Sequence, residues 1–599
     1  DGQYSVFMEQ ERYDLDLAVG FVDNEILRNL SEDFTVTLVK NDATEYTTEA
    51  GSDQFTFFVL DEEHQFICDG TGSPDSCTIA AFAPNEPLFL KKIAVDSLEI
   101  NGNILWTGGI SLEPLEIVTE DFVLGESARL VVDHLKIVVG NAATISGEII
   151  AGGGQATQLV SGGGEGGTHV GMGGKSSSSD SLLPNATLEL SFTNPTPGSD
   201  GSGNVYPAGA GGGTIWLEVA HQVQINGRIS ADGGDAEVMG GSGGGAGGWI
   251  SVNAEKIAGE GSITANGGRG GMDVNQTQDS RGGGGGGGLI RVTGHMGNPD
   301  DTAAQRWQGV VAARGGEAGG IDAEKGGMGA VCFRDLAILS APEDFDCYTL
   351  AFENSGAVSG RAASHLYGIS NLTILDELLV QGVTLYVDAE TQIDAPSGDV
   401  HLTAGAKLVN SHYIPFDGDR YSGNADLGFE VSDAQKEQEP EIGGVLSIHS
   451  NNLLLDANTK IESSLDLEIE NNLVIAGDRG LDASGKGFRG GEIGQDGLGV
   501  PNYGASQGYD VLYGNANLKS PFQVENFPLL PGGGGAGGSC GSGGFGGGTI
   551  RIKAQKLVLN SHNGIYADGG IGTADQDCLS EGGSAGSGGA GGSVFLDVK

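Results

Sequence analysis

Alternating apolar and polar residues recur along the chain, each time beside a run of glycines. The clearest copies are GGGTIWLEVAHQVQINGRISADGG, which begins at Gly211, and GGAGGWISVNAEKIAGEGSITANGG, which ends at Gly268. Strict alternation is typical of a strand with one buried face. Each copy therefore predicts one strand, a corner and a second strand, followed by a glycine-rich loop.

The same pattern returns many times, which indicates a repeat architecture. The first strands at Ile215, Ile250 and Ile290 are 35 and 40 residues apart, whereas the two halves of a copy stay about 14 residues apart. The variable part is the glycine-rich insert, and a constant strand pair with an elastic insert predicts a parallel β-solenoid. The second half of the pattern also occurs near Ile104, Ile149, Val311, Ile393, Leu481 and Ile565.

The pattern divides the chain into three parts. Residues 1–95 lack the glycine repeat and contain short strand-like runs separated by turn residues, which predicts a small amino-terminal β-domain, for capping or assembly. Residues 96–340 form a glycine-rich solenoid block. Residues 341–599 form a second block, with shorter repeats in its middle and further glycine-rich excursions. The predicted fold is all-β.

The glycine content and the charge restrict the class of protein. There are 108 glycines, yet 38% of the residues are apolar, so the glycines belong to an ordered fold. We expect runs such as Gly282–Gly288 to adopt extended threefold helices that pack backbone to backbone. With 30 basic and 80 acidic residues the net charge is −50. Nucleic acid is therefore excluded as a partner, and cations must screen the surface.

Six cysteines form three near-neighbour pairs, and none has the spacing of a zinc or redox motif. Local disulfides in an oxidising compartment are the simplest explanation. The chain has no apolar run long enough to span a membrane. Because residue 1 is aspartate, we expect a processed and secreted product. The predicted pairs are Cys68 with Cys77, Cys332 with Cys347, and Cys540 with Cys578.

Acidic turns are the most plausible ligand sites, because carboxylates beside glycine carbonyls supply the hard oxygen ligands that calcium prefers. Aspartate is also common in turns for backbone reasons, so a solvated turn is the alternative. Calcium is the one cofactor that the sequence suggests. The candidates are Asp232 and Asp235 in ADGGDAE, Asp417 and Asp419 in FDGDR, and Asp568, Asp575 and Asp577 in ADGGIGTADQD.

No catalytic motif stands out. The ten histidines are scattered, and the glycine runs lack the phosphate-binding signature. No G-x-S-x-G sequence is followed by a predicted helix, and the abundance of glycine and serine makes chance matches common. A polysaccharide lyase or hydrolase would need clustered carboxylates, with arginine or lysine, on one sheet face. The stacked positions show no evident cluster of this kind. We therefore predict that the protein is not an enzyme, with a glycan-cleaving β-helix as the alternative.

The repeat GG(A/G)GG-x-I-x-(V/L/I)-x-A followed by G-x-I-x-A-(D/N)-G-G resembles the glycine-rich repeats of large secreted and cell-surface proteins. The resemblance covers about residues 100–599 and implies a right-handed parallel β-helix in an adhesin-like or fibre-forming protein. We expect an extracellular structural subunit of a surface filament or biofilm matrix that binds copies of itself, head to tail or laterally. A monomeric adhesin stalk and a protein that binds surface glycans are the alternatives.

Overall fold

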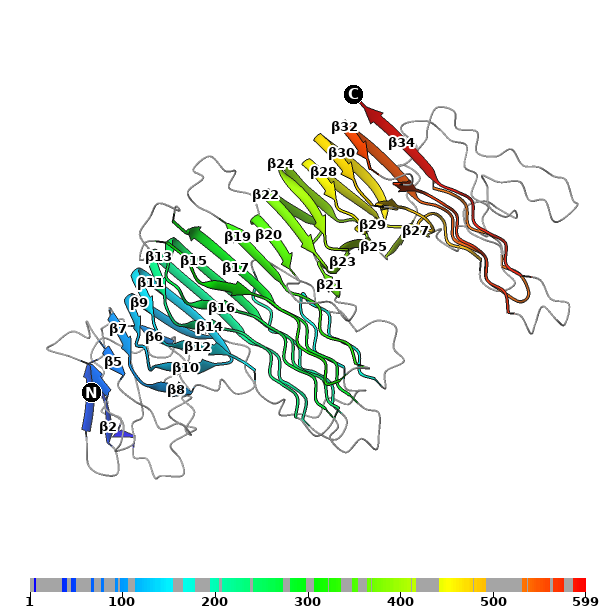
Figure 1. The fold of residues 1–599 in the computed structure, drawn as a ribbon. Helices are drawn as coiled ribbons and strands as arrows, with labels where there is room; N and C mark the ends of the chain where they lie inside the picture. The colour runs from blue at the N-terminus through cyan, green and yellow to red at the C-terminus, as the bar shows by residue number, and fades with distance from the viewer. Residues whose placement is uncertain are drawn as a thin grey trace, which may run out of the picture. The chain divides into compact units, whose positions relative to one another are not determined.

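The computed structural model is built from β-strands and extended segments, and the part of the chain that it describes contains no helix (Figure 1). The chain divides into two compact units. Unit 1 comprises residues 1–169, 173–184 and 193–339, and unit 2 comprises residues 170–172, 185–192 and 340–599. The structure describes residues 5–6, 35–39, 45–49, 66–68, 77–79, 92–94, 97–105, 114–153, 165–177, 194–203, 207–237, 241–272, 281–297, 306–320, 323–334, 347–353, 363–367, 369–410, 412–415, 441–477, 479–491, 531–535, 537–560, 564–575 and 585–599.

Unit 1 contains two parallel sheets, which the chain visits in turn. We call one long strand and the short strand that follows it a rung. The long sheet contains β7 (Ser97–Ile100), β9 (Leu115–Leu124), β11 (His134–Ile145), β13 (Thr214–Ile225), β15 (Trp249–Ala258), β17 (Leu289–His295) and β19 (Ala330–Arg334). The short sheet contains β8 (Asn103–Leu105), β10 (Arg129–Val132), β12 (Glu148–Ala151), β14 (Arg228–Ser230), β16 (Ser262–Thr264) and β18 (Val310–Ala312).

The strand register confirms the repeat that the sequence predicts. Ile215 pairs with Ile250 and Ile250 pairs with Ile290, so the steps of 35 and 40 residues are steps of one rung. The inward side chains of these columns are fully buried. Burial of one such aliphatic side chain contributes about 1.5–3 kcal/mol. The core is thus a set of parallel columns of isoleucine, leucine and valine.

Several of the long strands bend at a β-bulge. Val219 faces Ala254, but Gln222 faces Lys256, so β13 has one residue more than β15 at the bend. An extra residue of this kind increases the local twist and turns the strand. Polar side chains therefore collect on the outside of the bend, whereas the apolar alternation continues on both sides of it.

The strands before β7 do not all form a separate sheet. β1 (Ser5–Val6), β2 (Thr35–Val39) and β3 (Glu45–Glu49) form a small mixed sheet. By contrast, β4 (Phe66–Cys68) pairs with β5 (Cys77–Ile79), β5 continues onto β7, and β6 (Lys92–Ala94) pairs with β9. Part of the segment that we predicted to be an amino-terminal domain thus extends the long sheet of unit 1.

Unit 2 repeats the same alternation. Its long sheet contains β20 (Cys347–Glu353), β22 (Asn371–Gln381), β24 (Gln392–Thr403), β28 (Val445–Leu455), β30 (Ser464–Ile475), β32 (Thr549–Leu559) and β34 (Ser593–Val598). Its short sheet contains β21 (Ala363–His365), β23 (Thr384–Val387), β25 (Lys407–Asn410), β29 (Lys460–Glu462), β31 (Leu481–Asp482) and β33 (Ile565–Tyr566). An antiparallel pair, β26 (Tyr413–Pro415) and β27 (Glu441–Gly443), lies between β25 and β28.

One sequence assignment in unit 2 is wrong. We took Ile393 for the second, short strand of a repeat, but it lies in the long strand β24, paired with Leu372 and Ile448. In this glycine-poor part of the chain both halves of a rung have the same alternation. Without a glycine run to mark the end of a rung, the two halves look alike in sequence.

The glycine-rich inserts are extended segments that bond to one another through their backbones. Their N–H groups change partner with a period of three residues, the period of a polyproline II type helix. Segment 241–248 shows all three directions. Gly243 and Ala246 donate to Ser202 and Ser199, Gly244 and Gly247 donate to Gly283 and Gly286, and Gly245 and Gly248 donate to Gly234 and Ala231.

At many glycine positions this packing leaves no room for a Cβ atom. A Cβ added to Gly245 would lie 1.9 Å from the carbonyl oxygen of Ala210, and one on Gly285 would lie 1.9 Å from that of Gly245. The run Gly282–Gly288 follows the threefold pattern, because Gly282, Gly285 and Gly288 donate to one neighbouring segment. The predicted backbone-to-backbone packing of this run is confirmed. Unit 2 contains the same arrangement around segment 541–548.

Candidate functional site

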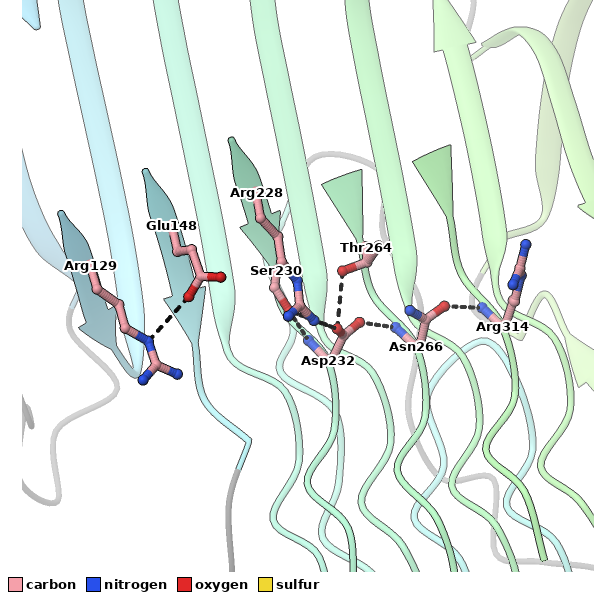
Figure 2. Close-up of polar contacts among 8 residues, drawn as sticks. All are labelled: Arg129, Glu148, Arg228, Ser230, Asp232, Thr264, Asn266 and Arg314. Carbon is pink, nitrogen blue, oxygen red and sulfur yellow. Dashed lines mark hydrogen bonds and ion pairs between the residues drawn. The ribbon is translucent and has the colours of Figure 1, made fainter. Parts of the chain in front are cut away.

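A ladder of polar side chains lies where the short strands of unit 1 end and the glycine-rich segments begin (Figure 2). The residue after the corner alanine is Asp232 on one rung, Asn266 on the next and Arg314 on the third. Oδ1 of Asp232 accepts the backbone N–H of Asn266 at 2.6 Å, and Oδ1 of Asn266 accepts that of Arg314 at 2.8 Å. Each side chain thus binds the backbone of the following rung. Unit 2 has a counterpart, in which Ser484 Oγ accepts the N–H of Asp568.

The second carboxylate oxygen of Asp232 is also bonded within the protein. Oδ2 accepts the hydroxyls of Ser230 at 2.8 Å and Thr264 at 3.0 Å, and it pairs with the guanidinium of Arg228. Charge-assisted hydrogen bonds of this kind are among the stronger ones in proteins. The geometry therefore gives Asp232 a role in holding two rungs together.

The other calcium candidates are placed as follows. Asp235 Oδ1 accepts the N–H of Arg269 at 2.6 Å, Asp568 lies 3.9 Å from the guanidinium of Arg479, and Asp575 is exposed. Within the described ranges, no group of three or more histidine, cysteine, aspartate or glutamate side chains could hold a metal ion. Calcium binding stays a prediction. Asp417, Asp419 and Asp577 lie outside the described residues.

Four of the cysteines lie on strands: Cys68, Cys77, Cys332 and Cys347. Cys332, Cys347 and Cys540 are each disulfide-bonded and buried. Cys68 on β4 stands directly opposite Cys77 on β5 in the antiparallel pair. Cys578, the predicted partner of Cys540, lies outside the described residues.

A cluster of charged side chains occupies the outward face of the long sheet of unit 2, and we call it the outer-face cluster. His449 lies between Asp394, 2.9 Å from Nδ1, and Glu470, 3.3 Å from Nε2. Beside it, Arg551 pairs with Asp466 at 3.3 Å and Lys553 pairs with Glu468. A shallow depression is lined by Gln392, Ser447, His449, Asp466, Glu468, Arg551 and Lys553.

The lysine and glutamate of this cluster influence each other's protonation. The hydrogen bond from Lys553 lowers the pKa of Glu468, and the same bond raises the pKa of Lys553. Both groups therefore remain charged over a wide pH range. The sequence pattern does not indicate this cluster, because its members lie far apart along the chain; Asp466 and Arg551 are 85 residues apart.

A second ionic group lies on the short sheet of unit 2. Asp482 is 5% exposed, and its carboxylate lies 2.7 Å from Nζ of Lys460 and 3.6 Å from the guanidinium of Arg479. Burial alone would raise the pKa of Asp482, but the hydrogen bonds from Lys460 and Ser484 lower it overall. Burial lowers the pKa of Lys486, whose ammonium donates to the carbonyl oxygen of Asn410 at 2.6 Å.

The last rung of unit 2 exposes side chains that are buried on the other rungs. Val594 continues the column of Ile550 and Leu596 continues that of Ile552. Ile550 and Ile552 are completely buried, whereas Val594 is 41% exposed and Leu596 is 49% exposed. The side chains of β34 thus continue the columns of the apolar core and are exposed in this structure.

The glycine segment before β34 has an open side as well. Gly588 and Gly591 are exposed, and a Cβ on either would have its nearest neighbour at 3.6 Å. Elsewhere in these bundles the exposed positions carry side chains such as Asp235, Arg269 and Glu317. Glycine at 588 and 591 is therefore not required by any contact that the structure shows.

Comparison of the chain with protein-family models, with curated proteins and with solved structures finds no match in any of the three. None of the described residues belongs to a helix long and apolar enough to cross a membrane.

Proposed function

We propose that both units are right-handed parallel β-helices and that the protein is an extracellular structural subunit that assembles with copies of itself. The regular alternation between a long and a short parallel sheet supports the first part. Each rung adds one strand to both sheets in a constant register, the behaviour expected of a solenoid. The disulfide-bonded cysteines support an oxidising, extracellular location.

The stacked architecture supports the proposal of self-assembly. An apolar strand with an open edge is a template for pairing with another chain. The rung of β34 shows what such an edge offers: exposed core columns and the glycine face at Gly588 and Gly591, which a further rung of the same kind would cover together. We propose that a second copy supplies that rung at the end of a stack.

The net charge of −50 adds a condition to this assembly. Copies of so acidic a chain repel one another, and dissolved cations reduce that repulsion over a screening length of about 8–10 Å at physiological salt. We therefore expect assembly to require salt or divalent cations. Removal of calcium by a chelator at constant ionic strength would distinguish bound calcium from general screening.

The test compares the assembly of three chains by light scattering and negative-stain microscopy. We expect the unmodified chain to form multimers, and Leu596→Asp to remain monomeric because it places a charge at the centre of the interface. Ile571→Asp is the control. Ile571 is an apolar side chain of the same unit, 92% exposed, and outside β34, so its replacement should leave assembly unchanged.

Single particles of the unmodified chain at every concentration and salt level would refute self-assembly and favour a monomeric adhesin stalk. Equal multimers from the unmodified chain and Leu596→Asp would refute only the role of β34.

A further inference from the structure

Two neighbouring columns of outward side chains cross the long sheet of unit 2. The first consists of Gln392, Ser447, Asp466, Arg551 and Phe595. The second consists of Asp394, His449, Glu468, Lys553 and Asp597. Because neighbouring strands lie about 4.8 Å apart, the columns form a regular strip of donors and acceptors over five strands. The outer-face cluster and its depression lie on this strip.

Stability does not explain why so many charges are gathered here. The side chains of the Arg551–Asp466 and Lys553–Glu468 pairs are all more than 40% exposed. Ion pairs in such positions contribute about 0–1 kcal/mol each. The strip therefore adds little to the stability of the fold.

Unit 1 provides an internal comparison, because its long sheet has the same register. Trp216 and Glu218 occupy the positions on β13 that Asp466 and Glu468 occupy on β30. Unit 1 has an ion pair in the corresponding columns, between Lys136 and Glu116, at 3.0 Å. Where unit 2 has Asp466, Arg551, Glu468 and Lys553, unit 1 has Trp216, Ser251, Glu218 and Asn253. The same sheet thus forms with one charged residue at these four positions instead of four.

The chemistry of the strip restricts the ligand. Five carboxylates surround the two cations and His449, so an anionic ligand would be repelled. The exposed carboxylates, guanidinium, amide and hydroxyl offer closely spaced donors and acceptors, at intervals that the strand register sets. Phe595, 37% exposed, adds an aromatic face next to Arg551.

We propose that the outer-face cluster binds a neutral, hydroxyl-rich oligosaccharide that lies across the strands. Sugar hydroxyls donate to the carboxylates and accept from Arg551 and Gln392, and the apolar C–H face of a sugar ring packs on Phe595. This binding goes beyond self-assembly, because it uses the outward face of the rungs whereas assembly uses the end of the stack.

The test is affinity electrophoresis of the whole chain in native gels that contain hydroxyethylcellulose, laminarin or glucomannan, with polygalacturonate as the acidic comparison. We expect retardation by at least one neutral polymer, insensitive to salt. Asp466→Asn and Arg551→Gln should each weaken it at least fivefold. Glu116→Gln and Lys136→Gln remove a similar ion pair from unit 1 and should leave it unchanged.

Three results would overturn the proposal: unchanged migration in every neutral gel, equal retardation of Asp466→Asn and the unmodified chain, or retardation by polygalacturonate alone. Thermal unfolding of each variant shows whether it is folded. Because retardation is measured on chains kept at low concentration and monomeric by light scattering, failure of this proposal is separate from failure of self-assembly.

Discussion

Replacement of Gly245 by alanine tests the packing of the glycine segments most directly. The added Cβ would lie 1.9 Å from the carbonyl oxygen of Ala210, an oxygen that already accepts the N–H of Gly234 at 2.7 Å. Ordinary contact needs a separation more than 1 Å larger, so segment 241–248 must move away from a neighbour. Overpacking of this kind costs about 1–3 kcal/mol.

Lost hydrogen bonds increase that cost. Each backbone bond that is broken without replacement costs about 1 kcal/mol, and movement of the segment weakens one or two. The lower entropy of alanine in the unfolded chain offsets about 0.4–1 kcal/mol. We expect a net destabilisation of unit 1 of about 2–4 kcal/mol, measured as a lower thermal midpoint and as faster amide exchange across the glycine segments.

Gly588→Ala is the matched control. Its Cβ meets no atom closer than 3.6 Å, so the same substitution should leave stability unchanged or raise it slightly. Equal effects of Gly245→Ala and Gly588→Ala, measured on the monomeric chain, would refute the view that steric exclusion of side chains determines where glycine is needed.

Two further predictions concern the ionic groups. Asp232→Ala should destabilise unit 1 by about 1–3 kcal/mol, because the N–H of Asn266 loses its acceptor, whereas Asp232→Asn keeps that acceptor and should cost less; equal melting of both variants would contradict the ladder. The pKa of Asp482 is lower in the folded chain than its usual 3.8, so its stabilisation is complete above that value and is lost as the pH falls through the folded pKa. Lys460→Met removes the partner and should lower the thermal midpoint more at pH 7 than at pH 3, and a deficit independent of pH would show that Lys460 does not act through Asp482.

Much of the fold could be predicted from local patterns. The Ile-x-Ala corners and the steps between Ile215, Ile250 and Ile290 indicated the columns, because a stacked repeat must place the same residue type at the same height on each rung. The run Gly282–Gly288 predicts the packing of the glycine segments, because residues without a Cβ atom let two backbones approach closely.

The functional surfaces were harder to predict. Asp466 and Arg551 are 85 residues apart, on neighbouring strands β30 and β32 that a long insert separates in the sequence. Because the lengths of such inserts vary, no fixed spacing in the sequence reveals the pair. In the sequence, Asp232 is a calcium candidate because its carboxylate stands beside glycine carbonyls. The structure gives its carboxylate protein donors from the next rung, which a single copy of the repeat cannot show.

The period of three in the glycine segments restricts how their length can change. Removal of one residue from segment 241–248 would turn every following N–H by about 120°, toward a neighbour that offers no acceptor at that height. Removal of three residues would restore every direction. Natural variation within such a segment should therefore proceed in whole turns of three residues.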